Sequence, residues 1–111
     1  MSKLYKEEGM DFQKLLEQAQ QMQNEMMKIQ GELSETIYTG NSGGAEGVTV
    51  KMNGDTEVQV VLIADELMDP ENKEILQDML VIAFNDALDK VNSDREEKLG
   101  VFSQGAGFPG L

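Results

Sequence analysis

Residues 12–33 read FQKLLEQAQQMQNEMMKIQGEL, and their apolar side chains recur at alternating steps of three and four residues. The residues of this repeat, called the seam below, are Phe12, Leu15, Ala19, Met22, Met26, Ile29 and Leu33. Heptad spacing of this kind is typical of a helix that packs along a narrow stripe against another helix. The residues between them are mostly Gln, Glu and Lys, which are good helix formers. The pattern predicts a long helix that ends near Ser34 and associates with a second copy of the chain.

The composition restricts the chemistry that the protein can perform. Its 111 residues suffice for one domain with a modest core. Without cysteine or histidine, the chain lacks disulfides, thiolate ligands, and the commonest metal ligand and general base. The sequence also has no apolar run long enough to span a membrane and no signal-peptide core. We expect a soluble cytoplasmic protein, not an enzyme, with no cofactor, no small-molecule substrate and no membrane contact.

The middle of the chain predicts three strands. Residues 36–40 form a short β-favouring run, and the small residues 41–45 after it indicate a loop. Apolar residues then alternate over 48–52 as far as Asn53-Gly54, a dipeptide that favours a hairpin. Residues 57–63 supply the return strand, so the segment predicts a three-stranded antiparallel sheet.

A second helix is predicted after the sheet. Asp69 is a good N-cap, Pro70 needs no hydrogen-bond acceptor in the first turn, and Glu71 complements the helix dipole. The helix is expected to run from Pro70 to about Leu99 and to become polar on all sides toward its end. The predicted order is a long helix, three strands and a long helix, an α/β (α+β) fold.

Apolar residues on more than one face indicate where a partner packs. The return strand is apolar on both faces in its second half, and the middle of the second helix is apolar over more than one stripe. The expected dimer interface therefore comprises most of the seam, namely Phe12, Leu15, Ala19, Met22, Met26 and Ile29, together with Val61, Ile63, Leu80 and Phe84.

The two ends of the chain differ from its centre. Residues 1–9 show little periodicity and are expected to form a flexible leader. Residues 100–111 are rich in glycine and are expected to form a flexible tail. Residues 10–99 remain as the folded dimerisation and binding domain.

Neither of two tempting ligand motifs is convincing. The glycine-rich residues 43–47 lack the lysine and the following helix of a phosphate-binding loop. The acidic residues between 65 and 74 lack the spacing and central glycine of a calcium loop. We expect a flexible loop and a solvated acidic turn, with no metal site and no catalytic residue.

The chain carries 9 basic and 21 acidic residues, a formal net charge of −12, which repels polyanions at long range. Its cations nevertheless gather in two groups, with Lys28 as a further candidate. The groups are Lys3, Lys6 and Lys14 near the start of the first helix, and Lys90, Arg95 and Lys98 near the end of the second. If these ends meet, they form a positive surface able to contact phosphates. The alternative is that all are ordinary solvated side chains balanced by neighbouring carboxylates.

Three segments together resemble the YbaB/EbfC family of bacterial nucleoid-associated proteins. They are LLEQAQQMQ at 15–23, GGAEGVTVKMNG at 43–54 and AFNDA at 83–87, and the likeness extends from Met10 to the tail. The resemblance implies an intertwined homodimer with protruding helices that binds double-stranded DNA in the nucleoid. It also implies altered DNA conformation or expression of nearby genes. DNA contacts are then expected on the projecting helix ends, at Lys14, Lys90, Arg95 and Lys98.

Two other functional classes remain open from the residues alone. The acidic surface and the exposed strand or seam are compatible with a protein-interaction module that recruits a basic or replication-associated partner. An enzyme that relies on Asp and Glu alone is a weaker possibility, since the sequence shows no nucleophile paired with a base.

Overall fold

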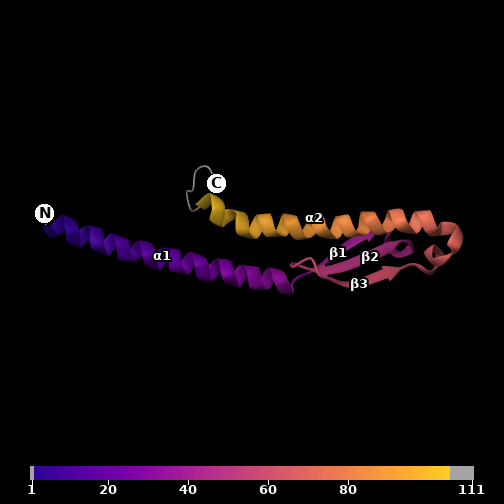
Figure 1. The fold of residues 1–111 in the computed structure, drawn as a ribbon, viewed down its shortest axis with the longest axis horizontal. Coiled ribbons are helices and arrows are strands. Elements are labelled where there is room, and N and C mark those ends of the chain that lie inside the picture. The colour runs from indigo at the N-terminus through magenta and orange to yellow at the C-terminus, as the bar shows by residue number, and fades with distance from the viewer. Residues whose placement is uncertain (1, 106–111) are drawn as a thin grey trace.

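The computed structural model describes the backbone of residues 2–105 and the side chains of residues 11–102. Helix α1 (Ser2–Glu35) leads into strands β1 (Ile37–Ser42), β2 (Val48–Asn53) and β3 (Val58–Ile63), and helix α2 (Lys73–Gly105) runs back over the sheet (Figure 1). The order of helix, three strands and helix is the predicted one. Three short 3-10 turns, Gly44–Glu46, Asp65–Met68 and Pro70–Asn72, complete the chain.

The three strands form an antiparallel sheet in the order β1-β2-β3. Burial alternates along the first two strands, with Tyr38, Gly40 and Ser42 buried on β1 and Val48, Val50 and Met52 buried on β2. Because neighbouring strands keep their faces in register, all of these residues face α2. The predicted alternation is confirmed for β2, whereas β3 is exposed except at Ile63, and β1 continues to Ser42, beyond the predicted Gly40.

Helix α2 packs closely over β1 and β2 and leaves β3 largely uncovered. Ala83, Ala87 and Val91 line its buried face and are almost inaccessible. The helix approaches so closely because β1 has a glycine beneath it. A Cβ at Gly40 would lie 2.1 Å from the carbonyl oxygen of Ala83 and 2.5 Å from the amide nitrogen of Ala87.

The hairpin between β2 and β3 also anchors α1. Its turn is longer than the Asn53-Gly54 signal suggests, because β3 begins only at Val58 and Thr56 adopts a left-handed φ of 61°. The Asn53 side chain accepts hydrogen bonds from the amides of Asp55 and Glu57. Gly54 lies against the end of α1, where a Cβ would be 2.0 Å from the carbonyl oxygen of Leu33.

The ends of both helices differ from the prediction. Residues 2–9, expected to be a flexible leader, continue α1 as a helix, because Lys, Leu and Glu sustain a helix even without an apolar repeat. Helix α2 begins at Lys73, after the 3-10 turn Pro70–Asn72. The Asp69 carboxylate caps that turn, accepting a hydrogen bond from the amide of Glu71 at 3.0 Å. It continues through Gly100 to Gly105, beyond the predicted end at Leu99. The rest of the predicted tail, residues 106–111, lies outside the described residues.

The chain is far more elongated than a compact domain. Its radius of gyration is 22.6 Å and its extents are 83 × 26 × 15 Å. A compact chain of this length has a radius of gyration of about 13 Å. Figure 1 shows the reason, since the amino-terminal part of α1 projects past the end of α2. Within the described residues, neither helix has a stretch apolar and long enough to cross a membrane.

Candidate nucleic-acid interface

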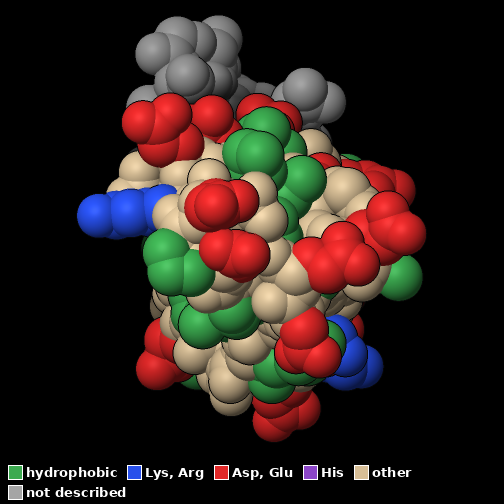
Figure 2. All heavy atoms as spheres, turned by 90° about the vertical axis from the view of Figure 1, so that its right-hand side faces the viewer, with side chains coloured by type: hydrophobic (Ala, Val, Ile, Leu, Met, Phe, Trp, Pro, Cys, Tyr) green, Lys and Arg blue, Asp and Glu red, His purple; other side chains and the backbone are tan. Residues whose placement is uncertain are grey.

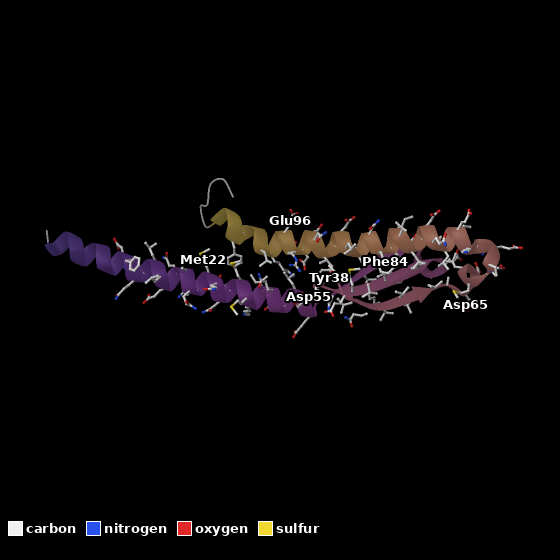
Figure 3. All side chains as sticks on the ribbon, viewed as in Figure 1. Met22, Tyr38, Asp55, Asp65, Phe84 and Glu96 are labelled. Carbon is white, nitrogen blue, oxygen red and sulfur yellow. The ribbon has the colours of Figure 1, made fainter. Side chains whose placement is uncertain are left out.

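The two long helices form an arm that extends from the sheet. Leu33 is buried, and the seam residues Met22, Met26 and Ile29 are half-buried along the same side of α1. Helices α1 and α2 are in contact, and Figure 3 shows Met22 on the side of α1 toward α2. This half of the seam, predicted to lie in a dimer interface, runs where α1 contacts α2 of the same chain.

The other half of the seam has no cover within the described chain. Residues 11–20 are all exposed, and the side chains of Phe12 and Leu15 are 62% and 61% accessible. This segment belongs to the part of α1 that extends beyond α2 (Figure 1). The tip of the arm is therefore a single helix with an exposed apolar stripe.

Lys90 is held against the outer edge of the sheet. Its Nζ donates a hydrogen bond to the carbonyl oxygen of Thr39 at 2.6 Å and lies 3.3 Å from the carboxylate of Asp86. That carboxylate also accepts the amide hydrogen of Asn41 at 2.9 Å. The Asn41 amide, with Lys90 as a lesser contributor, holds the pKa of Asp86 below its usual value. The two side chains satisfy backbone groups on the free edge of β1.

Arg95 joins α2 to the hairpin. Its guanidinium donates to the carbonyl oxygen of Gly54 at 2.6 Å. Together with Gln30, Leu33, Ser34 and Asp55 it lines a cavity of about 280 Å³ where the arm meets the sheet. On the opposite wall, the Ser34 hydroxyl donates to the Asp55 carboxylate at 2.9 Å.

Lys98 belongs to a polar network around the buried side chain of Tyr38. It lies 3.0 Å from the Asp94 carboxylate, which also accepts the Tyr38 hydroxyl at 2.5 Å. Burial of the phenol, and then its hydrogen bond to Asp94, raise the pKa of Tyr38 to about 12. The Tyr38 hydroxyl, and then Lys98, hold the pKa of Asp94 below its usual value.

The five residues predicted to contact DNA thus divide into two kinds. Lys90, Arg95 and Lys98 are tied to the fold, whereas Lys14 and Lys28 on α1 are exposed and form no ion pair with any residue that the structure describes. The start of α1 does not meet the end of α2 as expected, because it projects beyond that end (Figure 1). The side chains of Lys3 and Lys6 lie outside the described range.

The expected dimer residues of the sheet lie at an open apolar surface. Val61 on β3 is 40% exposed, and Ile63, Leu80 and Phe84 are half-buried at the margin of the core. Farther round α2, Val81 and Ile82 are each more than half exposed. The side of β3 that faces α2 and the outer side of α2 therefore both lack a cover from the side chains that the structure describes.

The contacts of Asp86 and Asp94 are not predictable from the sequence. Asp86 and Asp94 each stand four residues before a lysine on a helix, a spacing that signals an ion pair. The signal was present, but nothing in the sequence shows that these same groups bind β1 and Tyr38. Among the described side chains, no cluster of three or more carboxylates is placed to hold a metal ion.

Comparison with known proteins identifies the group to which this architecture belongs. The model of the YbaB/EbfC DNA-binding family matches residues 8–106. A nucleoid-associated protein of Chloroflexus aurantiacus is 47% identical over 81% of this chain and 89% of its own length. A nucleoid-associated protein of Corynebacterium glutamicum is 45% identical over 87% of this chain and 93% of its own length.

A solved structure supports the same grouping at the level of the fold. The crystal structure of an uncharacterized protein from Helicobacter pylori superposes with a TM-score of 0.64 at 32% identity. The match covers 75% of this chain and 86% of that one. The elongated fold with its two-helix arm, and a family match that covers most of the sequence, place the chain in the YbaB/EbfC DNA-binding family.

Proposed function

We propose that this protein is a non-catalytic, homodimeric DNA-binding protein of the nucleoid. It binds duplex DNA through its two-helix arms, alters the conformation of the DNA and thereby affects gene expression. The observation that carries the proposal is the arm itself, whose projecting single helix has a fully exposed surface over residues 11–20. Membership of a DNA-binding family supports it.

The open apolar surface supports the dimer. Helices pack about 8–10 Å apart and strands lie about 4.8 Å apart, so one helix covers roughly two strands. Helix α2 accordingly covers β1 and β2, and a second helix fits beside it over Val61 and the rest of β3. The same symmetry places each α2 over β3 of the partner.

A dimer of this kind explains how a small protein deforms DNA. Two copies related by a twofold axis present two arms, and each arm contacts a separate stretch of one duplex. Bending the duplex between them costs a few kcal/mol, which the contacts at both arms offset. Lys14 and Lys28 contact phosphates in this arrangement, and Lys90, Arg95 and Lys98 add positive charge along α2.

A titration of labelled duplex DNA tests the proposal, with mass measured by light scattering on the same sample. We expect a dimer, a saturable shift at micromolar protein, and a change in energy transfer between dyes at the two DNA ends. A folded monomer, or no binding at low salt, would contradict it.

Neighbouring residues on opposite faces of β3 provide a matched pair of variants. Val61→Asp places a charge on the face toward α2, so we expect monomers and at least ten-fold weaker DNA binding. Leu62→Asp places the same charge on the outer face, where Leu62 is 54% exposed, and is expected to leave the dimer intact. Equal effects of the two substitutions would contradict the proposed dimer.

The acidic end of the molecule favours a second candidate function. Residues 65–78 carry six carboxylates and one lysine, and Figure 2 shows acidic side chains around this end. Such a surface suits a protein-interaction module that recruits a basic or replication-associated partner. Affinity capture with and without nuclease separates the two functions, because a partner that is retained after nuclease treatment favours the interaction module.

A further inference from the structure

Helix α1 carries an uncharged stripe next to its seam. The residues that directly follow the first six seam residues, from Phe12 to Ile29, are Gln13, Leu16, Gln20, Gln23, Met27 and Gln30, called the amide stripe below. They recur at steps of three and four residues, so they form a continuous line along the helix. None of them is ionisable, in a chain whose net charge is −12.

The opposite flank of the seam carries the charges. The residues that directly precede seam residues are Asp11, Lys14, Gln18, Gln21, Glu25, Lys28 and Glu32. Both lysines of α1 that were predicted to bind DNA thus share their stripe with three carboxylates. Of the two flanks, the amide stripe is the one that a polyanion approaches without meeting a carboxylate.

The side chains of the amide stripe are also exposed. Leu16 and Met27 are 54% and 64% exposed, and the four glutamines are exposed as well. Among described residues, the one hydrogen bond made by these glutamine side chains is a long contact of 3.5 Å from Gln20 to Asn24 on the same helix. The amides keep their donors and acceptors for a ligand.

The shape of the arm tip matches one kind of ligand. A single α-helix is about 10–12 Å wide, and the major groove of B-DNA is about 12 Å wide, so the groove admits one helix. The projecting segment of α1 is such a single helix, whereas the arm behind it is two helices wide (Figure 1). The amide stripe begins on this segment with Gln13, Leu16 and Gln20.

We infer that the amide stripe is the DNA-reading surface of α1 and that it lies in the major groove. Glutamine amides pair with the N6 and N7 edge of adenine, and an apolar side chain such as Leu16 contacts the thymine methyl group. The stripe therefore favours A·T pairs. This inference rests on the proposed DNA-binding function and assigns its contacts to uncharged side chains.

If the contacts to DNA are mostly uncharged, the affinity for DNA depends only weakly on salt concentration. Binding that neutralises Z phosphates weakens with salt with a logarithmic slope of about −0.9Z. Lys14 and Lys28 are the two lysines among the described side chains of α1, so the described part of each arm contributes a slope of at most roughly −2. Removing glutamines lowers affinity without changing this slope, because no phosphate contact is lost.

Glutamines on the two flanks of the seam supply a matched comparison in the full-length protein. The test variant combines Gln13→Ala, Gln20→Ala and Gln23→Ala, and the control combines Gln18→Ala and Gln21→Ala. We expect the test variant to bind an A·T-rich duplex at least ten-fold more weakly with an unchanged salt slope, and the control to bind within two-fold of the parent protein. Alanine favours helix, so both variants retain the parent helicity by circular dichroism.

Three results would overturn the inference. One is a test variant that binds as tightly as the control. Another is a change in mass of the test variant by light scattering, which would make the stripe a protein contact. The third is equal affinity for a duplex in which 7-deazaadenine, lacking N7, replaces adenine. Absence of DNA binding by the parent protein would instead refute the proposed function itself, and this inference with it.

Discussion

At the scale of single residues, the buried tyrosine links the sheet to the arm. Tyr38 on β1 donates to Asp94 on α2, and Asp94 in turn holds Lys98. The hydroxyl must stay protonated to donate, which is consistent with the raised pKa of Tyr38. The network therefore fixes where the arm leaves the sheet, and its strength depends on pH.

The pH dependence has a definite sign. The pKa of Tyr38 rises from 10.0 to about 12 in the fold, so its contribution to stability is complete below pH 10 and is lost as the pH approaches 12. Tyr38→Phe removes this alkaline loss and costs about 1 kcal/mol at neutral pH, the net worth of a hydrogen bond. Urea unfolding of both proteins at a series of alkaline pH values measures the two effects. An unchanged alkaline slope in the variant would contradict them.

At the scale of elements, the sequence predicts whether a segment is a helix or a strand more reliably than it predicts which other element that segment packs against. The seam correctly indicates that α1 packs against another helix, but its period does not say whose helix. Met22 faces α2 of the same chain and Met26 is half-buried, because α2 continues to Gly105. Phe12, beyond its reach, stays exposed.

The candidate site was less predictable, because its main contacts join distant segments. Lys90 and Arg95 are recognisable as cations in the sequence, yet their partners are carbonyl groups of β1 and of the hairpin. Every residue has a backbone carbonyl, so the residue types do not show which carbonyl accepts a hydrogen bond. The roles of these residues in the fold therefore appear only when the elements are placed in space.

Two glycines test how closely the elements pack. A Cβ at Gly31 on α1 has open space around it, so Gly31→Ala is expected to stabilise the protein by about 1 kcal/mol through helix propensity. A Cβ at Gly40 meets the backbone of α2, so Gly40→Ala is expected to destabilise it by about 3 kcal/mol or more. Thermal unfolding of both variants measures the opposite shifts. Loss of stability in both would show that α1 is packed at Gly31.

At the scale of the whole molecule, the charges are unevenly distributed along an 83 Å axis. The acidic end at residues 65–78 lies at the far end of the sheet from the projecting tip of α1 (Figure 1). Charges at that end act on DNA only through the long-range field, which salt screens over about 10 Å at 0.1 M and about 30 Å at 0.01 M. The net charge therefore affects the approach to DNA more than the bound state.

Reversing charges at the acidic end separates these two effects. Glu71→Lys combined with Glu74→Lys changes the formal net charge from −12 to −8, because each reversal adds two positive units. We expect the association rate with duplex DNA to rise several-fold at about 0.01 M salt and by less than about two-fold at 0.15 M, with the dissociation rate unchanged. Stopped-flow fluorescence at both salt concentrations measures the rates. A slower dissociation at either concentration would place Glu71 and Glu74 in contact with the DNA, and the arms would then not be the sole binding surface.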